Sequence, residues 1–259
     1  FICVNQVPDT ETKIVPTSDG SYIETTGVKW IISPYDEFAI EQAVLVKSKV
    51  PDTTITAIRV GGTKDSEALR TAMAMGVDEA ILVEAPDHLD SYSTAKAIKG
   101  AIEKSGKKAD LIYAGKQAID SDALQVPQIL AEMLALPSVS VIVAHELNGS
   151  TLSVKREIEG GSIEVYDVAL PALVSCNKGL NTPRYPSLPG IMKAKKLPLT
   201  TLKLEDVGVS SSDTRVVYKG VHLPPEKAAG KKFDAMDDGK TASVVSEVVG
   251  LLHNEAKAV

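Results

Sequence analysis

Short apolar runs alternate with amphipathic segments through the first 140 residues. The runs are rich in Val, Ile, Leu and Ala, and the segments repeat apolar residues at the three-to-four-residue spacing of a helix. Four strand–helix pairs in succession predict a mainly parallel sheet with helices on both faces, a Rossmann-like three-layer α/β fold. The predicted strands span residues 1–4, 54–60, 80–83 and 111–114, and the predicted helices span 33–50, 67–75, 92–104 and 124–134.

Capping and turn residues sharpen these boundaries. Ser33 is a suitable N-cap, Pro34 suits the first helical position, and Asp36 favours the positive end of the helix. Gly76 is placed where a helix C-terminal cap belongs. Ser-Asp-Gly at 18–20 divides two β-favouring stretches, which predicts a hairpin over 13–25.

The pattern changes after residue 134. Four short strands follow, and Asn148-Gly149 is a strong hairpin turn between the first two, so we expect antiparallel strands to extend the sheet. We expect no regular structure over 177–198 and a final amphipathic helix near 244–252. The chain should divide into a nucleotide-binding domain, 1–200, and a C-terminal arm with a helix that packs on a partner subunit, 201–259. These four strands are predicted at 139–146, 152–157, 163–168 and 173–176.

Composition excludes several classes of protein. The 259 residues carry a net charge of −6, which argues against a nucleic-acid partner because phosphate contacts need a basic face. Cys3 and Cys176 both lie in apolar runs and are expected to be buried reduced thiols. The histidines show no ligand spacing, so no metal site is expected. No serine–histidine–carboxylate triad can be assembled, and we expect no catalytic nucleophile.

Three strand-to-helix junctions form the first candidate site. The junction at 114–122, before the helix predicted from Leu124, offers free backbone N–H groups to a phosphate, and Gly115 would allow a ligand to approach the main chain. Asp120 and Asp122 suit ribose hydroxyls or a helix cap. Residues 33–36 and 60–62 should lie at the same sheet edge. An ordinary strand–helix loop explains the same pattern, and neither GxGxxG nor a Walker A sequence is present.

The loop at 177–198 forms the second candidate site. Its prolines stiffen the chain and lower the entropy lost on binding. Leu188, Ile191 and Met192 would be exposed apolar anchors, while Arg184 and three lysines would attract acidic partners. A packed surface loop with a solvated basic end is the alternative. The charged strand that includes 155–157 is equally consistent with a solvated sheet face.

These segments together resemble the electron-transfer flavoprotein beta-subunit family. The resemblance rests on joint order and spacing and covers nearly the whole chain up to about residue 199. The matching stretches are Arg70-Thr71-Ala72-Met73-Ala74-Met75-Gly76, Gly115-Lys116-Gln117-Ala118-Ile119-Asp120, Arg156-Glu157-Ile158-Glu159-Gly160-Gly161, Leu170-Pro171-Ala172, Leu180-Asn181, Pro183-Arg184-Tyr185 and Leu188-Pro189-Gly190-Ile191-Met192-Lys193-Ala194-Lys195-Lys196.

The resemblance implies a subunit that pairs with an alpha subunit, which holds most of a redox-active FAD, and that buries an AMP. It implies docking of acyl-CoA dehydrogenase-type partners at 176–198, with electrons leaving to a membrane quinone reductase. It implies that the protein is located in the cytoplasm of a bacterium or in the mitochondrial matrix of a eukaryote. The implied nucleotide-binding residues are Cys3, Ser33, Pro34, Tyr35, Asp36, Val60, Gly115, Gln117, Ala118, Asp120, Ser121, Asp122, Ala123, Leu124, Gln125 and Val126. The implied partner-recognition residues are Arg184, Tyr185, Leu188, Pro189, Ile191, Met192, Lys193 and Lys196.

One departure from the family pattern leaves alternatives open. AMP-binding members tend to carry small hydroxyl or amide side chains where this chain has Val126 and Pro127, and some bifurcating relatives, which bind a second FAD and use NADH, carry a similar Gln-Val pair. The 33–37 stretch is closer to the plain electron carriers, so AMP is the preferred ligand. A stand-alone nucleotide-binding regulatory domain is the alternative of another class.

Overall fold

The computed structural model describes residues 1–86, 89–227, 229–234 and 239–258. The chain forms two compact units, residues 1–221 and 222–259. Strand β11 (Leu199–Lys203) belongs to the sheet of the first unit, so the boundary expected at residue 200 falls inside a strand. Residues 228, 235–238 and 259 of the expected arm lie outside the described residues.

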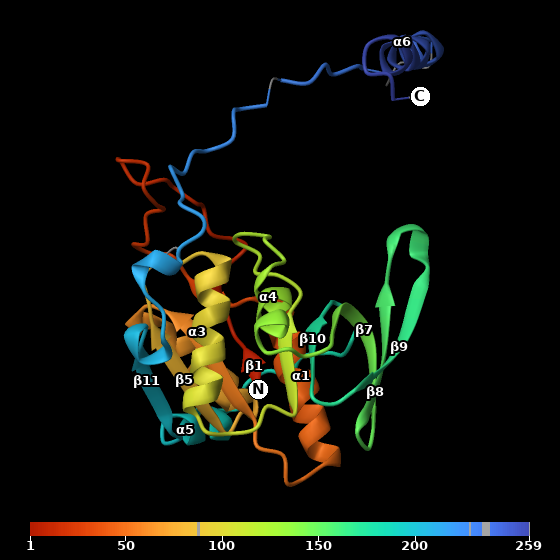
Figure 1. Cartoon of the computed structure of the whole chain (residues 1–259). Coiled ribbons are helices and arrows are strands. Elements are labelled where there is room, and N and C mark those ends of the chain that lie inside the picture. Colours follow the sequence, from red (N-terminus) through yellow and green to blue (C-terminus); the bar gives the residue numbers. More distant parts are fainter. Residues whose placement is uncertain (87–88, 228, 235–238, 259) are drawn as a thin grey trace. The chain divides into compact units, whose positions relative to one another are not determined.

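The first unit is built on a nine-stranded sheet with the order β11-β5-β4-β1-β6-β10-β7-β8-β9. All neighbours from β11 to β7 are parallel, while β7, β8 and β9 pair antiparallel and extend one end of the sheet (Figure 1). The strands are β1 (Ile2–Cys3), β4 (Thr56–Gly61), β5 (Glu79–Glu84), β6 (Leu111–Gly115), β7 (Ser138–Asn148), β8 (Thr151–Glu157), β9 (Ile163–Ala169) and β10 (Ala172–Cys176).

Helices cover both faces of this sheet. One face is covered by α1 (Pro34–Lys49) and α2 (Ser66–Met75), whose aliphatic residues share a buried cluster with Ile2, Tyr113 and Val174. The other face is covered by α3 (Ser91–Lys104) and α4 (Val126–Met133), which bury a second cluster. The predicted three-layer α/β fold with an antiparallel extension is therefore confirmed.

The helix α1 begins at Pro34 after Ser33, as expected, but the side-chain cap is absent and one other helix start is wrong. Ser33 makes no side-chain cap of α1, because its hydroxyl donates instead to the backbone oxygen of Gln117, at 3.5 Å. The helix expected from Leu124 begins at Val126, because Leu124 has a φ of 51° and leaves the helical region. Gly76 ends α2 as expected, with a φ of 129° that favours glycine.

Three further expectations need correction. Strand β10 is not part of the antiparallel extension, since it runs parallel between β6 and β7. The stretch 177–198 contains a short helix, α5 (Leu188–Ala194), which begins where the Ser187 hydroxyl accepts from the Gly190 N–H. The hairpin expected over 13–25 is reduced to one antiparallel bridge between Pro16 and Ile23.

The remaining elements are small. Strands β2 (Gln6–Pro8) and β3 (Trp30–Ile32) form a separate antiparallel pair. Single 3₁₀ turns occur at Glu205–Val207 and Ser211–Asp213. The second unit contains α6 (Thr241–Asn254), the expected final helix, with no residue of its length buried. Over the described ranges, no helix combines the length and apolar character needed to cross a membrane.

Candidate functional site

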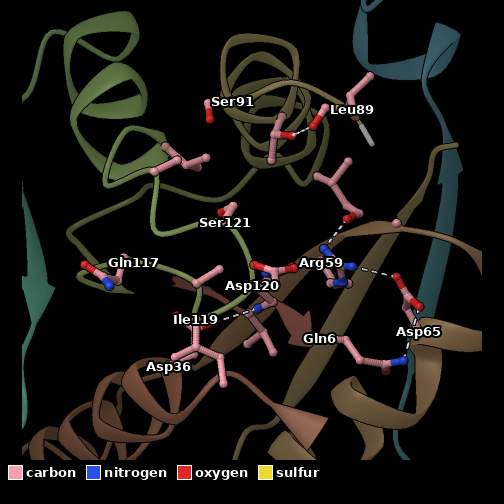
Figure 2. A pocket seen from close by; sticks show the side chains of 18 of the residues that line it. Gln6, Asp36, Arg59, Asp65, Leu89, Ser91, Gln117, Ile119, Asp120 and Ser121 are labelled. Carbon is pink, nitrogen blue, oxygen red and sulfur yellow. Dashed lines mark hydrogen bonds and ion pairs between the residues drawn. The ribbon is translucent and has the colours of Figure 1, made fainter. Parts of the chain in front are cut away.

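The chain reverses its direction of winding at β1. From β1 it proceeds to β4 and β5 on one side, and β6 then joins β1 from the other side. In open parallel sheets, ligands bind beyond the carboxyl ends of the strands at such a switch point. A cavity of about 900 Å³ lies there, lined by residues that follow β1, β4 and β6 (Figure 2). Its volume is within the range of small-molecule sites, roughly 300–1,000 Å³.

Most of the residues expected to bind a nucleotide line this cavity. Four of them do not: Ser33 is fully buried behind it, Pro34 begins α1, Tyr35 faces the Lys116 ammonium at 4.7 Å, and Asp122 accepts a hydrogen bond from Gln117. The expected residues that line the cavity are Cys3, Asp36, Val60, Gly115, Gln117, Ala118, Asp120, Ser121, Ala123, Leu124, Gln125 and Val126.

Asp36 joins the ends of two strands at the base of the cavity. Its carboxylate accepts from the backbone N–H of Asn5, at 2.7 Å, and of Gly115, at 2.8 Å. Burial raises the pKa of Asp36 to about 7, although the two backbone hydrogen bonds oppose that rise. The side chain therefore fixes the site's backbone, with both oxygens already engaged by the protein.

Gly115 lines the cavity, and its lack of a side chain also has a structural role within the chain. A Cβ at this position would lie 2.5 Å from Asp36 Oδ1 and 2.8 Å from the Tyr35 carbonyl carbon. The glycine is therefore required so that the first turn of α1 can pack against the end of β6. The sequence reasoning did not predict this packing of α1 against Gly115.

A buried ion pair that the sequence reasoning missed crosses the cavity wall. Arg59 Nη2 donates to Asp65 Oδ2 at 2.7 Å, and the other oxygen of Asp65 accepts from Gln6 Nε2 at 3.3 Å (Figure 2). Gly61 leaves room for the pair, because a Cβ there would meet both partners. The available signal was an arginine within a strand whose other residues are buried and mostly apolar.

The loop before α4 contains two residues with a left-handed backbone conformation. Asp122 and Leu124 adopt left-handed conformations, with φ values of 49° and 51°, which are uncommon for residues other than glycine. Alternation of left- and right-handed residues turns successive N–H groups toward one point, and the N-terminus of α4 adds its partial positive charge. Backbone strain of this kind concentrates at binding sites. Leu124 is also 41% exposed beside the cavity.

Four aspartates, Asp9, Asp36, Asp65 and Asp120, are part of the polar lining. Asp120 faces Arg59 across the cavity floor (Figure 2), and burial raises the pKa of Asp120. Both oxygens of Asp36 and of Asp65 are engaged within the chain, so Asp120 is the one of these three carboxylates that suits hydrogen-bond donors of a ligand, such as ribose hydroxyls or an exocyclic amine.

Residues remote in sequence complete the rim. The loop between β2 and β3 contributes Thr10, Ile14 and Tyr22, while Tyr218 and Val221 come from the end of the first unit. The helix α3 contributes Ser91 and Thr94. Sequence reasoning found none of these, because only tertiary packing brings them to the carboxyl edge.

The second candidate site is the surface of α5. Tyr185 and Leu188 are 94% and 79% exposed, and Ile191 and Met192 are also exposed. Pro189, Lys193 and Lys196 lie on the same exposed segment. Exposed apolar side chains in one short, proline-stiffened segment are typical of a protein–protein contact. We call this surface, residues 185–196, the docking segment.

The docking segment is firmly attached on its inner side. Arg70 Nη1 on α2 donates to the backbone oxygens of Ala194 and Leu197, at 2.6 and 2.8 Å. Gly190 packs so closely on α2 that a Cβ would lie 2.5 Å from the Ala74 oxygen. The Arg70–Gly76 stretch thus supports α5.

Arg184, expected to meet a partner, is engaged within the chain. Its Nε and Nη2 donate to the two oxygens of Glu41 on α1, at 2.7 and 2.8 Å. Burial alone would raise the pKa of Glu41, but the hydrogen bonds from Arg184 hold that pKa below its ordinary value. Asn181 Nδ2 also bonds α1, at the Phe38 oxygen and at Gln42 Oε1. Arg184 and Asn181 therefore position the loop.

Among the described residues, neither the cysteines nor the potential metal ligands form a further candidate site. Cys3 and Cys176 are free and buried, and burial raises the pKa of Cys3 to about 12 and that of Cys176 further. Within the described part of the chain, no three His, Cys, Asp or Glu side chains gather as a metal site would require.

Comparison with known proteins identifies the family. Residues 21–207 match the model of the electron transfer flavoprotein domain. The chain is 42% identical to the electron transfer flavoprotein subunit beta of Bacillus subtilis, covering 100% of this chain and 99% of the relative. It is 38% identical to the subunit of the same name from Mus musculus, over 92% of this chain and 93% of the relative.

A third relative comes from a larger assembly. The caffeyl-CoA reductase-Etf complex subunit CarD of Acetobacterium woodii is 37% identical over 99% of this chain and 97% of its own length. The family match covers well over half of the chain, and the switch-point cavity lies at the edge where an α/β subunit binds its ligand. The chain belongs to the electron transfer flavoprotein family, as a beta subunit that serves electron transport.

Proposed function

We propose that this chain forms a heterodimer with an electron-transfer flavoprotein alpha subunit and binds AMP in the switch-point cavity. The redox-active FAD is held mainly by the alpha subunit, and this chain serves as a rigid base. The observation that carries the proposal is the cavity itself, with the left-handed loop at 121–126 before α4 and the Asp120 carboxylate. AMP supplies a phosphate for the first and a ribose and an amine for the second.

A second FAD in the same cavity is the competing ligand, and it would make the complex a bifurcating oxidoreductase that oxidises NADH. Two observations favour it. The cavity, at about 900 Å³, is near the upper end for small-molecule sites. Val126 offers only its backbone N–H to a phosphate, and Pro127 offers no donor. We favour AMP because the 33–37 stretch resembles the plain electron carriers.

The ligands are distinguished by their stoichiometry. The chain is purified with its alpha subunit, the heterodimer is denatured, and the released nucleotides are separated by chromatography. The proposal requires one AMP and one FAD per heterodimer. Two FAD molecules and no AMP would establish the bifurcating alternative, and a stable monomer that binds a nucleotide without any partner would favour a regulatory domain.

We further propose that the docking segment binds acyl-CoA dehydrogenase-type flavoenzymes, which donate electrons that later leave to a membrane quinone reductase. Leu188 is the proposed anchor, because a large apolar side chain that is 79% exposed contributes little to the fold. Interface hot spots are buried apolar anchors surrounded by polar contacts, and Lys193 and Lys196 would supply that rim.

A further inference from the structure

Residues 207–221 follow the length of α3 and end at the cavity. We call this segment the strap. Val207 and Val209 are buried against the α3 cluster, at 7% and 4% exposure. Gly100 on α3 accommodates them, since a Cβ there would lie 2.2 Å from the Val207 oxygen. Farther along, Lys96 Nζ meets Asp213 Oδ1 at 2.7 Å. The strap is therefore packed onto α3 and does not hang free at this end.

Asp90 is the strap's last attachment before the cavity. Its Oδ1 accepts from the Ser93 N–H at 2.9 Å and so caps α3, while Oδ2 accepts from the N–H groups of Arg215 and Val216 at 2.7 and 3.0 Å. The residue is 1% exposed. The Arg215 guanidinium adds a contact over the Tyr92 ring at 4.7 Å. A helix cap uses one oxygen, so the second oxygen is committed to the strap.

Beyond Asp90, the strap forms part of the cavity rim. Tyr218 and Val221 line the cavity, and the Val221 N–H donates to the Gly20 oxygen at 2.8 Å. The loop that carries Gly20 lines the cavity too, through Ser21 and Tyr22. The strap thus joins the α3 side of the opening to the loop between β2 and β3.

We propose that the strap is a wall of the nucleotide site and that Asp90 controls nucleotide exchange by holding it in place. The inference rests on the proposed function, because it requires a nucleotide in the cavity. Because Tyr218 and Val221 line the opening, separation of the strap from Asp90 or from Gly20 would widen the route by which a nucleotide leaves.

The test must separate the two roles of Asp90. Asp90→Ser retains a good N-cap for α3 but has no second oxygen for the Arg215 and Val216 N–H groups. Asp52→Ser, the same substitution at an exposed residue, is the matched control. The heterodimer is loaded with radiolabelled AMP, and the release rate is followed after addition of unlabelled AMP. Hydrogen exchange of the 213–221 amides is measured on the same samples.

Release from the Asp90→Ser heterodimer should be at least tenfold faster than from wild type, with faster amide exchange confined to the strap. Asp52→Ser should release AMP at the wild-type rate. Faster strap exchange with a release rate within twofold of wild type overturns the inference and leaves the proposed function intact. A wild-type heterodimer that retains no labelled AMP overturns the inference together with the AMP site.

Discussion

The cavity edge packs against α1 and the docking segment packs against α2, and the two regions are built in opposite ways. At the cavity, Asp36 is buried, and both of its carboxylate oxygens accept hydrogen bonds from backbone N–H groups. On the docking segment, Leu188 and Met192 remain exposed, and the polar groups Glu41 and Arg184 lie on its inner side. The cavity edge uses a buried carboxylate to hold backbone atoms in place, whereas the loop that leads into the docking segment is held by an ion pair whose arginine is half exposed.

This difference shows where each region can tolerate change. A buried polar group that holds backbone atoms cannot be altered without moving the whole sheet edge. An exposed apolar side chain contributes little to folding, so selection on it acts through binding. Substitutions in the cavity edge should therefore reduce stability first, and substitutions in the docking segment should reduce partner affinity first.

The largest effect is expected for Gly115→Ala. The new methyl group would overlap Asp36 and the first turn of α1, and overpacking of this kind costs about 3 kcal/mol of unfolding free energy. Urea denaturation of the heterodimer measures the loss, and the bound nucleotide should fall with it. Gly230→Ala, at a position with no neighbour within 4 Å, is the control and should leave the midpoint unchanged. Equal midpoints for both variants would refute the close packing of α1 on β6.

Leu188→Ala should be next in size and should act on binding alone. Loss of an anchor residue costs about 2 kcal/mol of binding free energy, or about 30-fold in affinity for the dehydrogenase. Electron uptake from the dehydrogenase is measured at limiting concentration, with flavin content and stability expected to match wild type. Ile163→Ala truncates another exposed apolar side chain, on β9, and serves as the control. If both variants take up electrons equally fast, Leu188 is not the anchor.

The smallest effect is expected for Arg184→Gln, which removes the two-pronged contact with Glu41. Because the Arg184 side chain is 44% exposed, the pair should contribute about 1 kcal/mol or less to stability. The loosened loop should nevertheless weaken docking by a few-fold, independently of salt concentration. Lys178→Gln, on an exposed lysine near the start of the loop, is the control. A loss of affinity that vanishes at high salt would instead show that Arg184 contacts the partner directly.

The sequence predicted the positions of the helices and strands better than it predicted which elements pack or pair with one another. Hydrophobic periodicity, together with turn and capping residues, located the four strand–helix pairs. Asn148-Gly149 located the hairpin between β7 and β8. The start of α4 was missed by two residues because Leu124 adopts a backbone conformation that its side chain does not favour. The short helix α5 was missed because it depends on support from α2, through Arg70 and Gly190, in a stretch rich in prolines.

By itself, the sequence determined the three-layer α/β class, the carboxyl-edge location of the site and the exposed character of residues 185–196. These follow from local periodicity and from residue chemistry, which act over a few neighbouring positions. The tertiary structure alone decided that α1 packs against Gly115, that Arg59 pairs with Asp65, and that the strap reaches the cavity. Each of these depends on the packing of surrounding elements, and two of them bring together groups more than fifty positions apart in the chain, which sequence spacing does not encode.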